Sequence, residues 1–120
     1  MERKVKHVTE VDSVTISEAI IICHPDHVLD YQRINHTTAL TRCESLAAAL
    51  ETAERIMDHM DTVIIILDDI LKFRCGSDIT ERNALIKPFL QYCLLNDATV
   101  FLKSEHISDS LQALIEKVFS

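Results

Sequence analysis

Residues 63–67 read Val-Ile-Ile-Ile-Leu and run directly into the acids Asp68 and Asp69. Val and Ile are branched at Cβ, which favours extended backbone over helix. A segment that is apolar on both faces is typical of a parallel strand that helices cover on each side. The sequence therefore predicts a buried parallel strand over 62–68 whose carboxyl end brings two acids to the rim of a sheet. Because adjacent strand residues point to opposite faces, Asp68 is the one expected in a site.

Strands and helices alternate along the rest of the chain. Short β-branched runs predict further strands, and apolar residues at helical spacing predict the helices between them. Such alternation implies right-handed crossovers and a parallel sheet with helices on both faces. We therefore expect a small three-layer doubly wound α/β domain, flavodoxin/receiver-like, with about four parallel strands in the order 2-1-3-4. The expected strands are 18–23, 37–41, 62–68 and 98–103, and the expected helices are about 26–34, 43–60, 79–95 and 107–119.

Local signals mark the ends of two helices. Thr41, with Glu44 three residues later, predicts a capping box for the helix over 43–60. Asp78 predicts the cap of the helix that follows the central strand. Pro88 lies inside that helix, where a proline removes a backbone hydrogen bond at a cost of about 3 kcal/mol. The sequence therefore predicts a kink or a break near this proline.

The length of the chain, 120 residues, is that of one domain. We expect a single α/β domain over 18–120, preceded by residues 1–17 as an N-terminal extension or an edge strand. The N-terminus is charged and polar, unlike a secretory signal. The four cysteines are far apart in the sequence, unlike a CxxC metal clip or a small disulfide framework. We expect reduced thiols in a cytoplasmic protein.

Charge and hydropathy exclude two classes of partner. The chain has 19 acidic and 12 basic residues and a net charge of −7. Nucleic-acid binding needs clustered Lys and Arg, which this sequence lacks, so we expect no nucleic-acid partner. No apolar run approaches the roughly 18–20 residues that span a bilayer, so we expect no membrane insertion. A protein partner, or a second copy in a homo-oligomer, remains compatible with this charge.

Polar residues follow several of the predicted strands. In open parallel sheets, ligands bind at the carboxyl ends of the strands, near the point where the winding reverses. The first strand brings His24 and His27 to this rim, the third brings Asp68, and the fourth brings Lys103. Asp68, His24 and Lys103 are therefore the candidate catalytic residues of a carboxylate/His site.

Two other kinds of site deserve comparison with this one. His24, His27 and Asp68 (or Asp69) are the nearest approach to a metal ligand set, since imidazole and carboxylate bind divalent ions. Polar residues also gather at strand ends because loops are solvated, and we expect no metal there. A thiol nucleophile at Cys23, beside His24, is the other alternative, although a buried cysteine usually packs as a small apolar side chain.

The second half of the chain resembles the receiver domains of two-component signalling. The resemblance covers roughly residues 40–120 and rests on a strand that ends in Asp68, a strand that ends in Lys103, and an amphipathic final helix. It implies that Asp68 accepts a phosphoryl group and that Lys103 clamps it. The chain departs from receivers in two ways. His24-Pro25-Asp26 stands where receivers place a pair of acids, and too few residues separate the last two strands for a fifth strand.

A single glycine, Gly76, leaves little provision for backbone that closely approaches a substrate. The sequence therefore favours a noncatalytic protein-protein interaction or regulatory module, a degenerate receiver-like adaptor that needs no cofactor. The alternative is a small enzyme or phosphoacceptor. The chain also has more apolar side chains than its buried faces require, which indicates a partner surface. These residues are Met57, Met60, Ile70, Leu71, Phe73, Tyr92, Leu94 and Leu95, and the predicted partner-binding residues are Ile70, Leu71 and Phe73.

Overall fold

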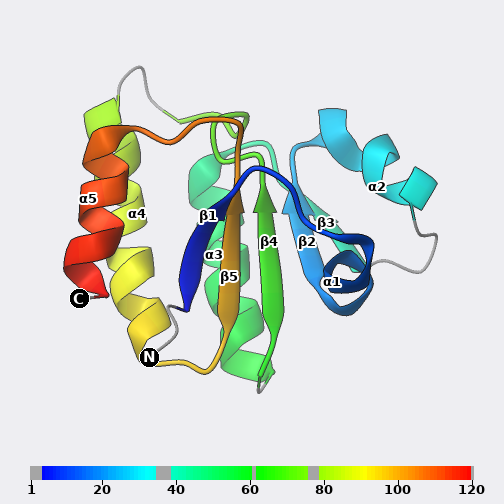
Figure 1. Ribbon diagram of the computed structural model, residues 1–120, viewed down its shortest axis with the longest axis horizontal. Helices are drawn as coiled ribbons and strands as arrows, with labels where there is room; N and C mark the ends of the chain where they lie inside the picture. The colour runs from blue at the N-terminus through cyan, green and yellow to red at the C-terminus, as the bar shows by residue number, and fades with distance from the viewer. Residues whose placement is uncertain (1–3, 35–38, 61, 76–78, 120) are drawn as a thin grey trace.

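Residues 4–34, 39–60, 62–75 and 79–119 are described by the structure, a computed structural model (Figure 1). Within them, parallel strands form one sheet, and helices lie between the strands along the chain. The strands are β1 (Val5–Val8), β2 (Ile20–Cys23), β3 (Ala39–Arg42), β4 (Ile64–Asp68) and β5 (Thr99–Lys103). The helices are α1 (Ser13–Glu18), the 3-10 turn η1 (Pro25–His27), α2 (Val28–Ile34), α3 (Leu46–His59), α4 (Ile79–Leu94) and α5 (Asp109–Val118).

The described strands have the spatial order β1-β5-β4-β2-β3, and every neighbouring pair is parallel. The predicted three-layer doubly wound α/β fold, flavodoxin/receiver-like, is therefore confirmed. The four strands expected from the sequence lie in the expected relative order. Within the described residues a further strand joins these four, because β1, in the segment expected to be an N-terminal extension or an edge strand, pairs with β5 at the edge, where Val5 lies opposite Val100.

Alternate residues of the central strand face two separate cores. Ile65 and Leu67 pack with the buried faces of α3, α4 and α5, which form the larger core. Ile66 packs with α1 and α2 on the other side of the sheet. The two groups of helices lie on opposite faces of the sheet (Figure 1). Side chains alternate along a strand, so Asp68 projects from the face that carries α1 and α2.

The predicted capping box of α3 is wrong. Ser45, not Thr41, caps α3, and its side chain accepts a hydrogen bond from the Ala48 N–H at 3.1 Å. Thr41 lies within β3, so the capping box does not form. Of the kink or break predicted near Lys87 and Pro88, the break is absent, since α4 continues through Pro88. The predicted cap Asp78 lies outside the described residues.

Packing explains why α4 survives its proline. Pro88 is exposed, whereas Ile86, Phe89 and Leu90 on either side of it are at most 1% exposed and belong to the larger core. Burial of one such side chain stabilises a fold by about 1.5–3 kcal/mol, so this stripe offsets the missing hydrogen bond. Among the described residues, no helix combines the length and the apolar character that a membrane crossing requires.

Candidate functional site

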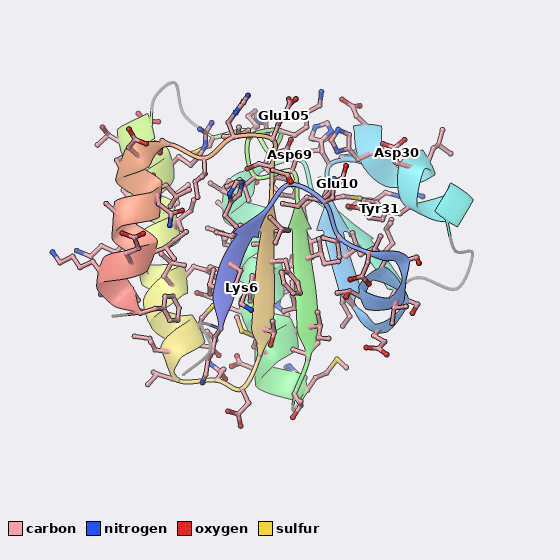
Figure 2. The ribbon with its side chains drawn as sticks, viewed as in Figure 1. Lys6, Glu10, Asp30, Tyr31, Asp69 and Glu105 are labelled. Carbon is pink, nitrogen blue, oxygen red and sulfur yellow. The ribbon has the colours of Figure 1, made fainter. Side chains whose placement is uncertain are left out.

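The carboxyl ends of β4 and β5 bring Asp68 and Lys103 together. These two residues are direct partners in the parallel register, so their side chains leave the same face of the sheet. The distance between Lys103 Nζ and Asp68 Oδ1 is 3.3 Å. Asp69 and Glu105, which follow the two strands, mark the same rim (Figure 2). The structure thus joins two of the three candidate catalytic residues in one ion pair.

The second oxygen of Asp68 faces a different element. His27 is the last residue of η1, and its Nδ1 lies 3.6 Å from Asp68 Oδ2. The Asp68 side chain is only 3% exposed, whereas those of Lys103 and His27 are 29% and 26% exposed. A buried carboxylate is costly unless its charge is balanced, and here nitrogen-bearing side chains approach both oxygens. Asp68, Lys103 and His27 form what we call the rim cluster.

Tyr31, labelled in Figure 2, belongs to α2 and packs in the core between that helix and the sheet, near Asp68 of the rim cluster. Its hydroxyl is buried and makes no hydrogen bond of normal geometry. Burial raises the pKa of the Tyr31 hydroxyl, and the nearby Asp68 carboxylate raises it further. Tyr31 therefore stays neutral and adds a neutral polar group beside Asp68. The sequence did not indicate a role for Tyr31 in the site, because its spacing from the apolar residues of the predicted helix over 26–34 indicated only a buried position.

His24 does not join Asp68 and Lys103, with which the sequence analysis grouped it. Its Nδ1 accepts a hydrogen bond from the Asp26 N–H at 3.2 Å and lies 3.5 Å from Asp26 Oδ2. The same Oδ2 lies 3.6 Å from Lys72 Nζ. His24 thus caps η1 and belongs to an outer pair at the molecular surface. The candidate catalytic set is divided, with Asp68 and Lys103 in the rim cluster and His24 in this outer pair.

The proposed metal ligands do not converge. Among the residues that the structure describes, no group of three or more His, Cys, Asp or Glu side chains is placed to hold a metal ion. His27 and Asp68 are neighbours, but His24 faces Asp26. Asp69 has a structural role instead, because its Oδ1 accepts a hydrogen bond from the Leu71 N–H at 3.0 Å. It caps the turn that follows β4.

Neither Cys23 nor Cys93 has the chemistry of a nucleophile. Burial, followed by the charge of Asp68, raises the pKa of the Cys23 thiol to about 11. Burial also raises the pKa of Cys93 to about 12. Both thiols are therefore protonated at neutral pH, and nucleophilic attack requires the thiolate. Both side chains are fully buried and pack as apolar groups.

The predicted partner surface needs a correction. Ile70 and Phe73 are 0% and 1% exposed and belong to the larger core, and only Leu71, at 41%, reaches the surface. The backbone turns back after β4, where the N–H groups of Lys72 and Phe73 both donate to the Asp69 carbonyl. This turn directs the two large side chains inward. They cannot contact a partner without opening the core.

Other members of the apolar surplus do reach the surface. Leu95 is 84% exposed, Met60 is 48% exposed and Leu94 is 44% exposed. These three residues, which we call the amino-edge patch, follow or end α3 and α4 at the edge opposite the rim cluster (Figure 1). Met60 and Leu95 line the same cavity of about 180 Å³. The remaining cavity-lining residues are Met57, Thr62, Asn96, Asp97 and Ala98.

Comparison of the chain with protein-family models, with curated proteins and with solved structures finds no match.

Proposed function

We propose that this chain is a noncatalytic protein-protein interaction module on a flavodoxin/receiver-like fold. The observation that carries the proposal is the amino-edge patch, in which Met60 and Leu95 are exposed around a shared cavity. A leucine that is 84% exposed beside a second exposed apolar residue leaves apolar surface in water. Grouped apolar surface of this kind is typical of a contact with another protein.

The rim cluster supports a noncatalytic role. Catalysis by a carboxylate requires that a substrate reach it, and Asp68 is 3% exposed with a nitrogen near each oxygen. The ion pair of Asp68 with Lys103 instead joins β4 to β5, and the 3.6 Å contact of Asp68 with His27 joins β4 to η1. Their contribution is to hold the carboxyl ends of the strands together, while the opposite edge carries the apolar surface.

The test compares partners captured by the full-length chain and by two matched variants. Leu95→Asp places a charge in the amino-edge patch. Leu85→Asp places the same charge at an exposed leucine of α4 outside it, where the side chain is 40% exposed. We expect specific partners to be lost with Leu95→Asp and kept with Leu85→Asp, as quantified by mass spectrometry. Equal capture by the wild type and both variants would show that the amino-edge patch does not bind these partners.

A phosphoacceptor function is the second candidate, and the 3.3 Å contact between Lys103 and Asp68 favours it. In this reaction an Asp68 oxygen attacks the phosphorus of an acyl phosphate, and the carboxylic acid leaves as its anion. The test incubates the protein with acetyl phosphate and Mg²⁺ and measures intact mass, with Asp68→Asn as the control. A phosphoryl adduct on the wild type alone would establish this function. No adduct on the wild type would exclude it for this donor.

A further inference from the structure

Helices α4 and α5 lie side by side on the same face of the sheet (Figure 1). Between them runs an open groove of about 270 Å³, and its exposed lining is mainly apolar. The described residues that line this α4–α5 groove are Lys87, Gln91 and Leu94 of α4 and Leu114, Lys117 and Val118 of α5. The groove is continuous with the amino-edge patch, because Leu94 belongs to both.

The outward face of α4 carries more apolar residues than a surface helix usually does. A helix that packs on a core with one side normally bears charged and polar residues on the other. On α4, Ala84 and Pro88 are exposed one turn apart, Leu94 at the end of the helix is 44% exposed, and Leu95 directly after it is 84% exposed. Apolar side chains grouped in this way are typical of a surface that another protein covers.

The charged residues that line the groove are basic. Lys87 and Lys117 are both exposed, and each helix contributes one of them. Glu116, next to Lys117 in the sequence, faces the other side of α5, because its Oε1 accepts a hydrogen bond from Gln112 Nε2 at 3.1 Å and Gln112 lines a separate cavity beside β1. The groove is thus a locally basic surface in a chain with a net charge of −7. Charge complementarity favours acidic side chains in its occupant.

The shape of the groove matches a helix. Its lining residues follow one stripe of α4 from Lys87 to Leu94, which is two turns or about 10 Å, and one stripe of α5 from Leu114 to Val118. An amphipathic helix binds in a groove of this kind through apolar residues spaced by three and four positions. Pockets for small molecules usually enclose the ligand and measure about 300–1,000 Å³, so an open groove of about 270 Å³ suits a free ligand less well.

We propose that the α4–α5 groove docks an acidic amphipathic helix of another protein. The apolar face of that helix packs on Leu94, Leu114 and Val118. Its Asp or Glu side chains lie against Lys87 and Lys117. This inference rests on the proposed interaction function, extends the contact surface beyond the amino-edge patch and adds the chemistry of the partner.

Two other occupants suit the groove less well. A symmetric dimer brings the same surface of each copy together, so the groove lysines of one copy would approach those of the other. Like charges placed opposite each other across an interface are costly. Anionic membranes are usually bound by clusters of about 4–8 Lys and Arg residues. Among the described residues, only Lys87 and Lys117 supply positive charge to the lining of this groove, and the chain as a whole is acidic.

The experiment uses two synthetic amphipathic peptides as probes, one of Leu and Glu and one with Lys in place of every Glu. Amide NMR spectra of the labelled full-length protein locate the binding, and titration measures its affinity. We expect the Glu peptide to shift the amide resonances of Lys87, Gln91 and Leu94 and of residues 114–118. The Lys peptide should leave these resonances in place, although the net charge of −7 attracts it to the protein as a whole.

Matched variants test the apolar and the charged parts of the groove separately. Leu94→Ser should weaken binding of the Glu peptide by about tenfold. Leu85→Ser makes the same change at a leucine of α4 outside the groove, 40% exposed, and should leave the affinity within about twofold. Lys87→Glu should weaken binding by about fivefold. Lys72→Glu makes the same change at a lysine that faces Asp26, and its effect should stay within about twofold.

Circular dichroism and thermal unfolding check that each variant is folded. Shifts centred on another surface, equal binding of both peptides in the groove, or equal weakening by the groove variants and their controls would each overturn the inference. Phosphatidylserine vesicles and light scattering test the other occupants. Vesicle binding that Leu94→Ser abolishes, or a dimer that this substitution dissociates, would assign the groove to a membrane or to a second copy instead.

The failure of the proposed function is distinguishable from the failure of this inference. If Leu95→Asp abolishes partner capture but the Glu peptide does not bind, the module has a partner, and that partner is not an acidic helix in the groove. If Leu95→Asp leaves capture unchanged but the Glu peptide binds in the groove, the groove is a docking surface and the amino-edge patch is not. If neither effect is seen, both proposals are wrong.

Discussion

Asp68 is the residue in which charge and burial conflict most strongly. Its side chain is 3% exposed, and the structure resolves the conflict by placing Lys103 Nζ near one oxygen and His27 Nδ1 near the other. The two partner side chains are each more than a quarter exposed, so water still reaches them. The cluster therefore resembles a half-buried ion pair, in which removal of the central charge leaves partners that remain hydrated.

Asp68→Asn should lower the free energy of unfolding by about 1–3 kcal/mol at neutral pH. This range lies below the ~3–5 kcal/mol expected for a fully buried pair, because Lys103 and His27 keep contact with water. Urea unfolding measures the change, with Glu105→Gln at the exposed end of the same rim as the control. A loss no greater than that of Glu105→Gln would show that the rim cluster contributes nothing to stability.

The buried thiols predict how stability changes at alkaline pH. Folding raises the pKa of Cys23 to about 11 and that of Cys93 to about 12, from an ordinary value of 9.0. Between these values the unfolded chain loses protons that the folded chain keeps, so the free energy of unfolding falls as pH rises above about 9. Cys93→Ala should make this decline less steep, whereas Cys75→Ser, at a partly exposed position, should not. The prediction would be contradicted if the free energy of unfolding fell equally steeply above pH 9 in the wild type, Cys93→Ala and Cys75→Ser.

At the scale of elements, helix α4 carries a proline that its packing overrides. Pro88 is exposed, and the residues beside it are buried against the sheet and neighbouring helices. Pro88→Ala restores a backbone donor and removes a clash, worth about 3 kcal/mol in a helix interior. The more flexible unfolded chain offsets about 1 kcal/mol of this gain. We expect a net stabilisation of about 2 kcal/mol in urea unfolding. Lys87→Ala is the control, and an unchanged or less stable Pro88→Ala protein would be inconsistent with a continuous helix.

Elements were predictable from the sequence where one local signal dominates. The run from Val63 to Leu67 could only be a buried strand, and the alternation of strands and helices was enough for the fold class. The start of α3 was not predictable, because Thr41 and Ser45 both offer a capping hydroxyl. A long-range contact selects Ser45: the Leu46 N–H donates to the Arg74 carbonyl, and the Arg74 N–H donates to the Glu44 carbonyl.

The candidate site was also predictable from the sequence only in part. Parallel strands end at one edge, so Asp68 and Lys103 could be placed together from the sequence. The turn after β4 could not be anticipated, because Ile70 and Phe73 are apolar whether they face a partner or the core. The capping bond from the Leu71 N–H to Asp69 and the backbone turn around it decide their direction.

On the scale of the whole molecule, the two edges of the sheet differ in character. The carboxyl edge is closed by the rim cluster, where polar groups satisfy one another. The amino edge exposes Met60 and Leu95 around a cavity that Asp97 also lines, and it exposes Leu94 at the end of α4. A module of this form would bind through one edge and use the other to stabilise its sheet.

Photo-crosslinking from each of the two edges tests which one contacts a partner. A photoreactive residue is placed at Leu95 in one sample and at the exposed rim residue Glu105 in another, and the full-length proteins are irradiated in an extract of the cells that produce them. We predict a discrete heavier adduct from position 95 and none from position 105. Adducts from position 105 with none from position 95 would contradict an interaction module that binds through its amino edge.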